Sequence, residues 1–402
     1  MFSASTPSLL FSVLPRPPHP TRDGLAIRNY HLLKALAGNF RVRTFVLVPQ
    51  HLAGEPSEYP PGVEVEVVPH GSRAARQALA IGASVLGGSA YPEMLYGSRR
   101  LARLLSRRAA QEKPAWVVAH SYHVGPLALA SARPAWIDFH NLDSEIWWQL
   151  GEIARSRFAR AFARAQSPRV ANLERRLARA ASGVSCVSAR DAGLLSALGP
   201  RTAPLVVPNG ADLTRYRFRD SPPPRETVLF VGDLGWAPNA LGVRWLREEI
   251  WPEVKQRRPQ ARAEILGRNA PAGLRREGGS DFVFSGDVAD TRPSLEAASV
   301  AVVPLRAGGG TRLKILEAAA CGVPVVSTRV GAEGLDFQEG TEILLADDAR
   351  AFASSVAKLL ADPAAASRQA RAARVRAEKL YGWEEIGRRF AAELLSRAQE
   401  WQ

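Results

Sequence analysis

The sequence predicts an α/β protein built from two doubly wound, Rossmann-like domains. Short apolar runs alternate with longer stretches of helical apolar spacing, which is typical of parallel sheets covered by helices. A chain of 402 residues is long enough for two hydrophobic cores. The turn signature Pro208-Asn209-Gly210 lies near mid-chain, where a link between two domains is expected.

The domain boundaries follow from these signals. We expect a first domain over residues 1–212, a second over 213–382 and a final amphipathic helix within 383–402. In the first domain, the apolar run at 8–14 predicts a strand, and the spacing of Ile27, Tyr30 and Leu33 predicts a helix over 25–36. Further strands are expected at 42–48, 63–68, 116–119, 136–139 and 184–188, and helices at 74–86 and 98–111.

The second domain is expected to begin with a strand over 228–231. The buried strand 300–303 leads into a glycine turn, and a helix follows to about Cys321, with Thr311 as its cap and Gly322 as its end. Other strands are expected at 263–266, at 282–284 and from 325, and other helices at 240–255, 349–360, 363–380 and 384–401.

Composition predicts a globular protein in a reducing compartment, the cytoplasm. Apolar residues make up 46% of the chain, and its two cysteines, Cys186 and Cys321, stand in apolar surroundings without metal-ligand spacing. We expect neither a signal peptide nor a membrane span. The nearest approach to a span, residues 74–95, is interrupted by Arg76 and Pro92.

The net charge of +14 is concentrated in the first half of the chain. Through Asp212 there are 25 Lys and Arg against 14 Asp and Glu. Such a surface suits anionic lipid, nucleic acid or an anionic acceptor, and it equally fits a solvated arginine-rich face. Nucleic acid is not expected, since no known binding signature is present. The arginines that contribute most are Arg155, Arg157, Arg160, Arg164, Arg169, Arg175, Arg176 and Arg179.

The turn at 308–310 is the strongest candidate for chemistry. Three glycines allow the backbone to approach a ligand closely, and the following helix start offers free N–H groups to phosphate. Arg312 and Lys314 oppose the helix dipole, which favours an anion nearby. Glu317, one turn on, suits ribose hydroxyls. An ordinary βαβ turn with solvated cations is the competing interpretation, and neither a Walker motif nor G-x-G-x-x-G is present.

A second polar group follows the strand expected at 136–139. Asp138, His140, Asn141 and Asp143 stand where a parallel strand ends, and ligands of such sheets bind there. His140 titrates near neutrality and can share a proton. His120 and His123 are alternatives, and a purely structural histidine is a further one.

The stretch 308–335, GGGTRLKILEAAACGVPVVSTRVGAEGL, resembles the donor-site signature of family 4 glycosyltransferases, which are retaining enzymes of the GT-B fold. The resemblance implies two domains that face each other across a cleft, with the acceptor in the first, the nucleotide-sugar donor in the second, and a last helix that crosses back. It places His140 beside the reacting sugar and Arg312 and Lys314 on the diphosphate. It implies donor contacts at Gly24, Gly286, Val288, Gly309, Gly310, Thr311 and Glu317.

The chain departs from the family pattern at two points. Gly309 stands where the family often has an acid, and the segment Trp236-Ala237-Pro238-Asn239 stands where many members carry a basic pair. The prediction is a cytoplasmic, metal-independent, retaining transferase without a cofactor, since no D-x-D triplet occurs. The acceptor would be a sugar, a lipid-linked sugar or a small molecule, and peripheral contact with an anionic membrane fits the basic half. The alternatives are an epimerase or phosphorylase of the same fold and a non-catalytic protein that binds nucleic acid or anions.

Overall fold

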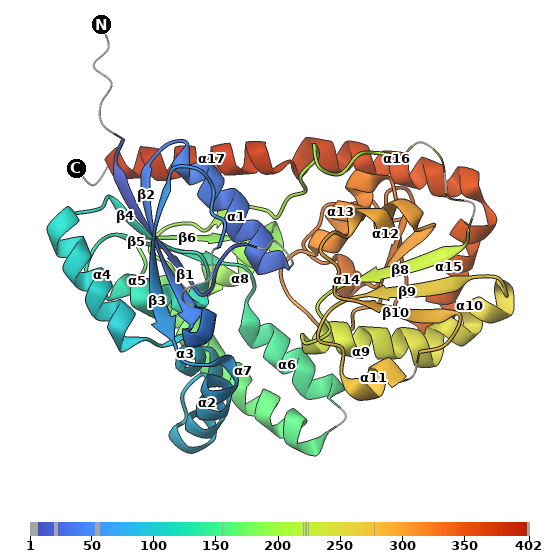
Figure 1. Ribbon diagram of the computed structural model, residues 1–402, viewed down its shortest axis with the longest axis horizontal. Helices are drawn as coiled ribbons and strands as arrows, with labels where there is room; N and C mark the ends of the chain where they lie inside the picture. The colour runs from blue at the N-terminus through green and yellow to red at the C-terminus, as the bar shows by residue number, and fades with distance from the viewer. Residues whose placement is uncertain are drawn as a thin grey trace, which may run out of the picture. The chain divides into compact units, whose positions relative to one another are not determined.

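The computed structural model describes residues 7–19, 23–52, 57–154, 156–219, 221, 223, 225–276 and 278–399. Arg155, one of the arginines counted above, lies outside them. The chain forms two compact units, one of Met1–Pro208 with Glu384–Gln402 and one of Asn209–Trp383. Each contains a parallel sheet with helices packed around it (Figure 1).

The sheet of the first unit has the strand order β3-β2-β1-β4-β5-β6-β7, and its pairings are parallel. The order reverses between β1 and β4, which is where a doubly wound sheet presents a ligand site. Its strands are β1 (Leu9–Leu14), β2 (Arg41–Pro49), β3 (Val63–His70), β4 (Trp116–Ala119), β5 (Ala135–Phe139), β6 (Gly183–Cys186) and β7 (Leu205–Val206). Its helices are α1 (Gly24–Ala37), α2 (Arg73–Gly87), α3 (Tyr91–Tyr96), α4 (Arg99–Glu112), α5 (Gly125–Leu129), α6 (Asp143–Ile153), α7 (Arg157–Ala180) and α8 (Ala189–Ala197), with 3-10 turns Gln50–Leu52 and Tyr122–Val124.

The second unit repeats the plan with the order β10-β9-β8-β11-β12-β13. Its strands are β8 (Thr227–Val231), β9 (Arg262–Leu266), β10 (Phe282–Gly286), β11 (Val300–Val303), β12 (Val325–Ser327) and β13 (Leu344–Leu345). Its helices are α9 (Ala237–Trp245), α10 (Trp251–Arg257), α11 (Ala272–Arg276), α12 (Arg292–Ala297), α13 (Leu313–Cys321), α14 (Arg329–Ala332), α15 (Ala349–Ala361) and α16 (Pro363–Leu380). A π-helical turn, Leu246–Ile250, joins α9 to α10.

Strands β4, β5, β6 and β11 are buried along their whole length, which accounts for their largely apolar runs. In β11 all four residues are buried, as both faces of a parallel strand are covered. Both cysteines are buried free thiols, as expected. No helix among the residues described is long and apolar enough to cross a bilayer.

The last helix, α17 (Trp383–Gln399), packs on the sheet of the first unit (Figure 1). Trp116 Nε1 of β4 donates to the carbonyl oxygen of Leu394 at 2.9 Å. The ring of Phe390 lies 5.9 Å from that of Trp136 in β5. Gly387 is needed at the crossing with α1, because a Cβ there would lie 2.5 Å from Ala35 Cβ. The core of the first unit therefore includes residues from both ends of the chain.

We expect Phe390→Ala to lower the free energy of unfolding by about 3–5 kcal/mol, because it removes a buried ring and leaves a cavity. Hydrogen exchange should show the loss of protection in β4 and β5, which are remote in sequence. Arg389→Ala, at an exposed position of the same helix, is the matched control and should cost little. Loss of protection confined to α17 itself would contradict this account of the core.

Candidate active site

The glycine turn between β11 and α13 adopts backbone angles that a residue with a Cβ atom could adopt only with strain. Gly308 has φ 148° and Gly310 has φ 66°, both in the region that side chains with a Cβ rarely adopt. A Cβ at Gly308 would also lie 2.5 Å from Nη2 of Arg312. The backbone conformation itself therefore requires glycine at these two positions, and the expected close approach of a ligand to this turn stays a prediction.

Arg312 braces the turn from within. Its guanidinium donates to the carbonyl oxygens of Gly309 and, at 2.9 Å, of Gly310, and Nη2 donates to Val330 O at 3.2 Å. The side chain is buried, so these bonds replace those that water would supply. Arg312 thus holds the backbone of the turn in shape, and its predicted diphosphate contact is a separate role that these bonds do not demonstrate.

Thr311 is not the cap of α13, contrary to the sequence expectation. The N-cap position is Arg312, and no side chain caps the helix there. Thr311 Oγ1 instead accepts a hydrogen bond from Asn209 Nδ2 at 2.9 Å, because the turn extends one residue further than expected and carries Thr311 to the Pro208–Gly210 segment. Within the described part of the chain, the N-cap side chain accepts no hydrogen bond from the first N–H groups of α13, a condition that suits an anion.

Lys314 points back to the end of β8. Its Nζ donates to Asn239 Oδ1 at 2.9 Å and lies 4.2 Å from the centroid of the Phe230 ring. A Cβ at Gly232 would approach Nζ to 2.8 Å, so glycine makes room for the ammonium. Burial, and then the charge of Arg312, lower the pKa of Lys314 to about 7. Asn239 thus occupies the place of the family's basic pair and holds the lysine.

Glu317 lies one turn further along α13, also inside the protein. Burial raises its pKa to about 7, against the hydrogen bond that Tyr216 Oη donates to Oε1 at 3.0 Å. Near neutrality this carboxyl can both accept and donate hydrogen bonds, which suits the hydroxyl recognition expected of it.

The other predicted donor contacts are less constrained by the structure. Gly286 ends β10 with φ 77°, and a Cβ there would meet nothing within 4 Å. Val288 is half-buried two residues on. Gly24 is the first residue of α1 in the other unit, and the helix is capped by Asp23, whose Oδ1 accepts from Ala26 N at 3.1 Å. Their roles in binding remain predictions.

The polar group after β5 is organised by a buried ion pair. Asp138 is fully buried and accepts two bonds from Arg28 of α1, each 2.8 Å long, and one from Ser185 Oγ at 2.7 Å. Burial alone would raise the pKa of Asp138, but the Arg28 guanidinium holds it well below the usual range. His140 Nε2 lies 3.0 Å from Asp138 Oδ2, a distance at which a protonated ring forms an ion pair with the carboxylate, although the geometry is not that of a hydrogen bond.

The three candidate histidines have different environments. His140 is largely buried, and burial lowers its pKa against the opposing effect of Asp138. His120 is fully buried against Ser12 Oγ at 3.1 Å, and burial lowers its pKa to about 3, so it is neutral. His123 lies 3.1 Å from Asp143 Oδ2 and stacks on Tyr96. His140 does not cap α6, whose N-cap is Leu142.

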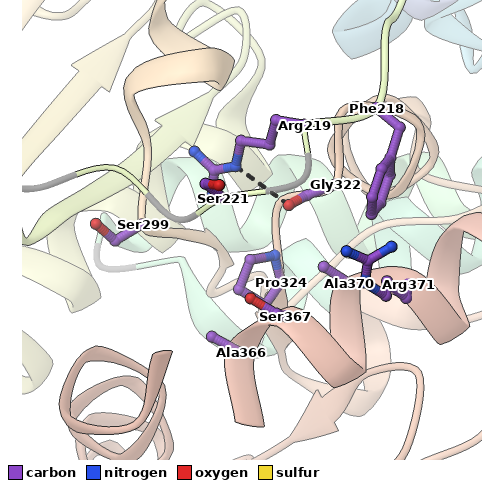
Figure 2. A pocket seen from close by; sticks show the side chains of 10 residues that line it. All are labelled: Phe218, Arg219, Ser221, Ser299, Gly322, Pro324, Ala366, Ser367, Ala370 and Arg371. Atoms are coloured by element: carbon purple, nitrogen blue, oxygen red, sulfur yellow. Dashed lines mark hydrogen bonds between the residues drawn. The ribbon is translucent and has the colours of Figure 1, made fainter. Parts of the chain in front are cut away.

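A pocket elsewhere in the second unit is separate from the glycine turn. Figure 2 shows Phe218, Arg219 and Arg371 around the C-terminal end of α13, where Arg219 Nε donates to Gly322 O at 3.3 Å. Since α13 has nine residues, this end lies about 13 Å from the turn. The pocket therefore does not include the predicted donor residues.

Comparison with known proteins links both units to one family. The Glycosyl transferase 4-like domain matches residues 23–210, and the Glycosyl transferases group 1 domain matches residues 225–362.

The chain belongs to the GT4-like glycosyltransferases. A relative of this GT4-like chain is the GDP-mannose-dependent alpha-(1-6)-phosphatidylinositol monomannoside mannosyltransferase of Mycolicibacterium smegmatis, 31% identical over 51% of this chain and 59% of the relative. Glycogen synthase of Mycobacterium tuberculosis is 29% identical over 50% of this chain and 51% of that protein. The matches thus span about half the length of these relatives.

Solved structures confirm the GT-B fold of the GT4-like chain. Sucrose-phosphate synthase from Thermosynechococcus elongatus superposes with a TM-score of 0.76 at 19% identity, over 98% of this chain and 100% of that one. The Anabaena protein HepE, in complex with UDP and glucose, gives a TM-score of 0.65 at 17% identity, over 97% and 99%. At such identities the likeness establishes the fold alone.

The sequence did not predict the contacts of four residues that position the site. Asn209, Tyr216 and Asn239 bond to predicted site residues, and Arg28 holds Asp138. Asn209 belongs to the turn signature predicted between the domains, and Asn239 belongs to the segment that departs from the family pattern. Nothing in the sequence marked Tyr216, which lies about 100 residues from its partner.

We expect Lys314→Met to raise the free energy of unfolding at pH 6 by about 1 kcal/mol or more, because it replaces a half-buried charged side chain with an apolar side chain of similar shape. The folded pKa is about 7 and the unfolded value 10.5, so the unfolded chain binds more protons between these values. The free energy of unfolding of the wild type should therefore rise between pH 7 and 10.5, and the advantage of Lys314→Met over the wild type should shrink over the same range. Urea titrations from pH 6 to 10 test this, with exposed Lys358→Met as the control. A variant less stable than wild type at pH 6 would refute it.

We expect Asp138→Asn to lower the free energy of unfolding by about 3–5 kcal/mol, because Arg28 would stay buried without a counter-charge. Glu152→Gln, which breaks an exposed pair with Arg164, is the control and should cost less than about 1 kcal/mol. Urea denaturation of the two variants distinguishes them. Equal losses would show that the buried pair is no more important than a surface one.

Proposed function

We propose that this protein is a retaining glycosyltransferase that moves a sugar from a nucleotide-sugar donor to a hydroxyl acceptor. One observation carries the proposal: α13 begins without a side-chain cap, directly after a glycine turn with positive φ angles and with half-buried Lys314 in its first turn. Free N–H groups, a helix dipole and a desolvated ammonium at one place match a diphosphate.

The donor contacts follow from these groups. The diphosphate would be held by the N–H groups of α13 and by Lys314, while Arg312 keeps the turn in shape and adds positive charge. Glu317 would bind ribose hydroxyls, and Gly286 and Val288 would border the base. HepE is described with UDP-glucose bound, and the mycobacterial relative is named for GDP-mannose, so both donor types are candidates.

The chemical step needs charge stabilisation above all. As the bond between the anomeric carbon and the diphosphate oxygen breaks, negative charge grows on the leaving group. Fixed N–H dipoles and cations at that position lower the barrier without reorganisation. We propose that His140 contacts the reacting sugar and that the reaction requires no divalent metal, since the sequence lacks a D-x-D triplet.

The acceptor is proposed as a sugar, lipid-linked or small-molecule hydroxyl compound. The basic first half of the chain, with 25 Lys and Arg against 14 Asp and Glu, favours an acceptor at an anionic membrane. A cytoplasmic location fits the two buried free thiols. An epimerase or phosphorylase of this fold is distinguished by incubation with labelled nucleotide sugar alone, because interconversion without transfer would favour the epimerase.

We expect UDP-glucose or GDP-mannose, within a panel of nucleotide sugars, to raise the melting temperature of the wild-type chain. Lys314→Met should weaken binding of the same compound about 10- to 100-fold, because it removes a charged hydrogen bond. Since the free pKa of Lys314 is about 7, binding at pH 8 should also take up protons, measurable by calorimetry in two buffers.

Exposed Lys358→Met is again the control and should bind the donor as wild type does. Unchanged affinity of Lys314→Met would overturn the diphosphate assignment. Failure of every nucleotide sugar to shift the melting temperature would overturn the proposed function itself.

A further inference from the structure

Trp236 is an exposed tryptophan directly before α9. Its side chain is 36% exposed, whereas Trp245 and Trp251 of the same unit are buried. Those two indoles donate Nε1 hydrogen bonds to Glu249 at 3.0 Å and to Asp281 at 3.2 Å. No residue that the structure describes accepts a hydrogen bond from Nε1 of Trp236. A large aromatic surface and an unused N–H donor, both open to solvent, are typical of a binding site.

The segment that carries Trp236 is held in place by hydrogen bonds around Asp233. The carboxylate of Asp233 accepts from Gly235 N and from Arg268 Nε, each at 2.9 Å. Its carbonyl oxygen accepts from Asn239 Nδ2 at 2.9 Å and from Trp236 N at 3.2 Å. The backbone of Trp236 is therefore fixed without a ligand, as a residue that positions a ligand requires.

The ring of Trp236 extends to the glycine turn. Strands β8 and β11 are neighbours, and the strand order of the second sheet reverses between them, which is where such a sheet binds its ligand. Trp236 follows β8, and Gly308 follows β11. A Cβ at Gly308 would lie 3.3 Å from Cη2 of Trp236. The exposed indole thus lies at the switch point, with the edge of its ring against the turn.

The location of the ring relative to the proposed donor contacts identifies the part of the donor beside it. Glu317, the proposed ribose contact, lies five residues beyond the N-cap Arg312, about 7.5 Å along the axis of α13. The proposed base contacts follow β10, which is two strands, about 9.5 Å, from β8. Ribose and base are therefore placed away from Gly308. The part of the donor on the other side of the diphosphate is the sugar that is transferred.

The chemistry of the ring also favours a sugar over the diphosphate itself. The face of an aromatic ring carries partial negative charge, so it repels phosphate oxygens. A pyranose presents C–H groups that can pack on the ring and hydroxyl oxygens that can accept from Nε1. The glycines of the turn offer no side chain, and the atoms nearest to a Cβ at Gly308 belong to Arg312 and Trp236. Trp236 is thus the side chain that can give a sugar at this turn an apolar contact.

We propose that Trp236 binds the transferred sugar of the donor, with its ring against the C–H groups of one sugar face and Nε1 donating to a hydroxyl. This inference rests on the proposed function and names one more residue of the same site.

The test is titration calorimetry of the full-length chain with two pairs of compounds, UDP-glucose with UDP and GDP-mannose with GDP. For the pair that binds wild type, Trp236→Ala should weaken the nucleotide sugar about tenfold and the nucleoside diphosphate by less than about twofold, because only the sugar loses an apolar contact. Trp148→Ala, at a 59% exposed tryptophan of the first unit, is the matched control and should bind both compounds as wild type does.

A second variant keeps an aromatic ring against the turn. Trp236→Phe should weaken the nucleotide sugar by only about threefold, because it loses one hydrogen bond and retains most of the apolar contact. Its affinity for the nucleoside diphosphate should equal that of wild type, which verifies that the site is folded. This variant gives the answer even where the alanine variant does not fold.

Three results would overturn the inference. An equal loss of affinity for the nucleotide sugar and the nucleoside diphosphate would show that Trp236 only supports the turn or contacts the base. Wild-type affinity of both variants for the nucleotide sugar would show that the ring contacts no part of the donor. Failure of wild type to bind either pair would instead overturn the proposed function, and this inference with it.

Discussion

Ionisable side chains buried at the start of α13 constrain the rest of the second unit. An ammonium and a carboxyl inside a protein require partners and space. Asn239 and the Phe230 ring hold Lys314, Tyr216 binds Glu317, and Gly232 leaves room for the lysine. A chain selected for stability alone would place apolar residues there. Burial shifts the pKa of both groups to about 7, and such perturbed values are typical of functional sites.

The first unit uses a different solution to the same constraint. Asp138 is fully buried, yet it stays ionised. It accepts a bidentate pair of hydrogen bonds from Arg28 and a further one from the hydroxyl of Ser185. Its charge lies next to the ring of His140, whose Nε2 is 3.0 Å from Oδ2. The electrostatic environment of this histidine is therefore set by groups on a strand, a helix and a neighbouring strand.

The sequence predicted the fold because the fold rests on local signals. Buried parallel strands are unbroken apolar runs, and three consecutive glycines mark the turn that contains Gly308 and Gly310. Short elements such as α3, and the contacts of Tyr216 and Asn209, arise from residues distant in the chain, which periodicity does not detect. Thr311 resembled a helix cap because capping is judged from neighbouring residues. In the structure its hydroxyl instead accepts a hydrogen bond from Asn209, which is 102 positions away in the chain.

The inclusion of α17 in the first unit has a consequence for biogenesis. Leu394 lies 278 residues after Trp116 in the chain, and Phe390 likewise comes long after Trp136, yet the two residues lie against these indoles of the first sheet. Until α17 has been synthesised, the two indoles have no cover from this helix, although their strands were made long before. The core of the nascent first unit is therefore incomplete until α17 emerges, and chaperone contact during that interval would be directed to the uncovered tryptophans.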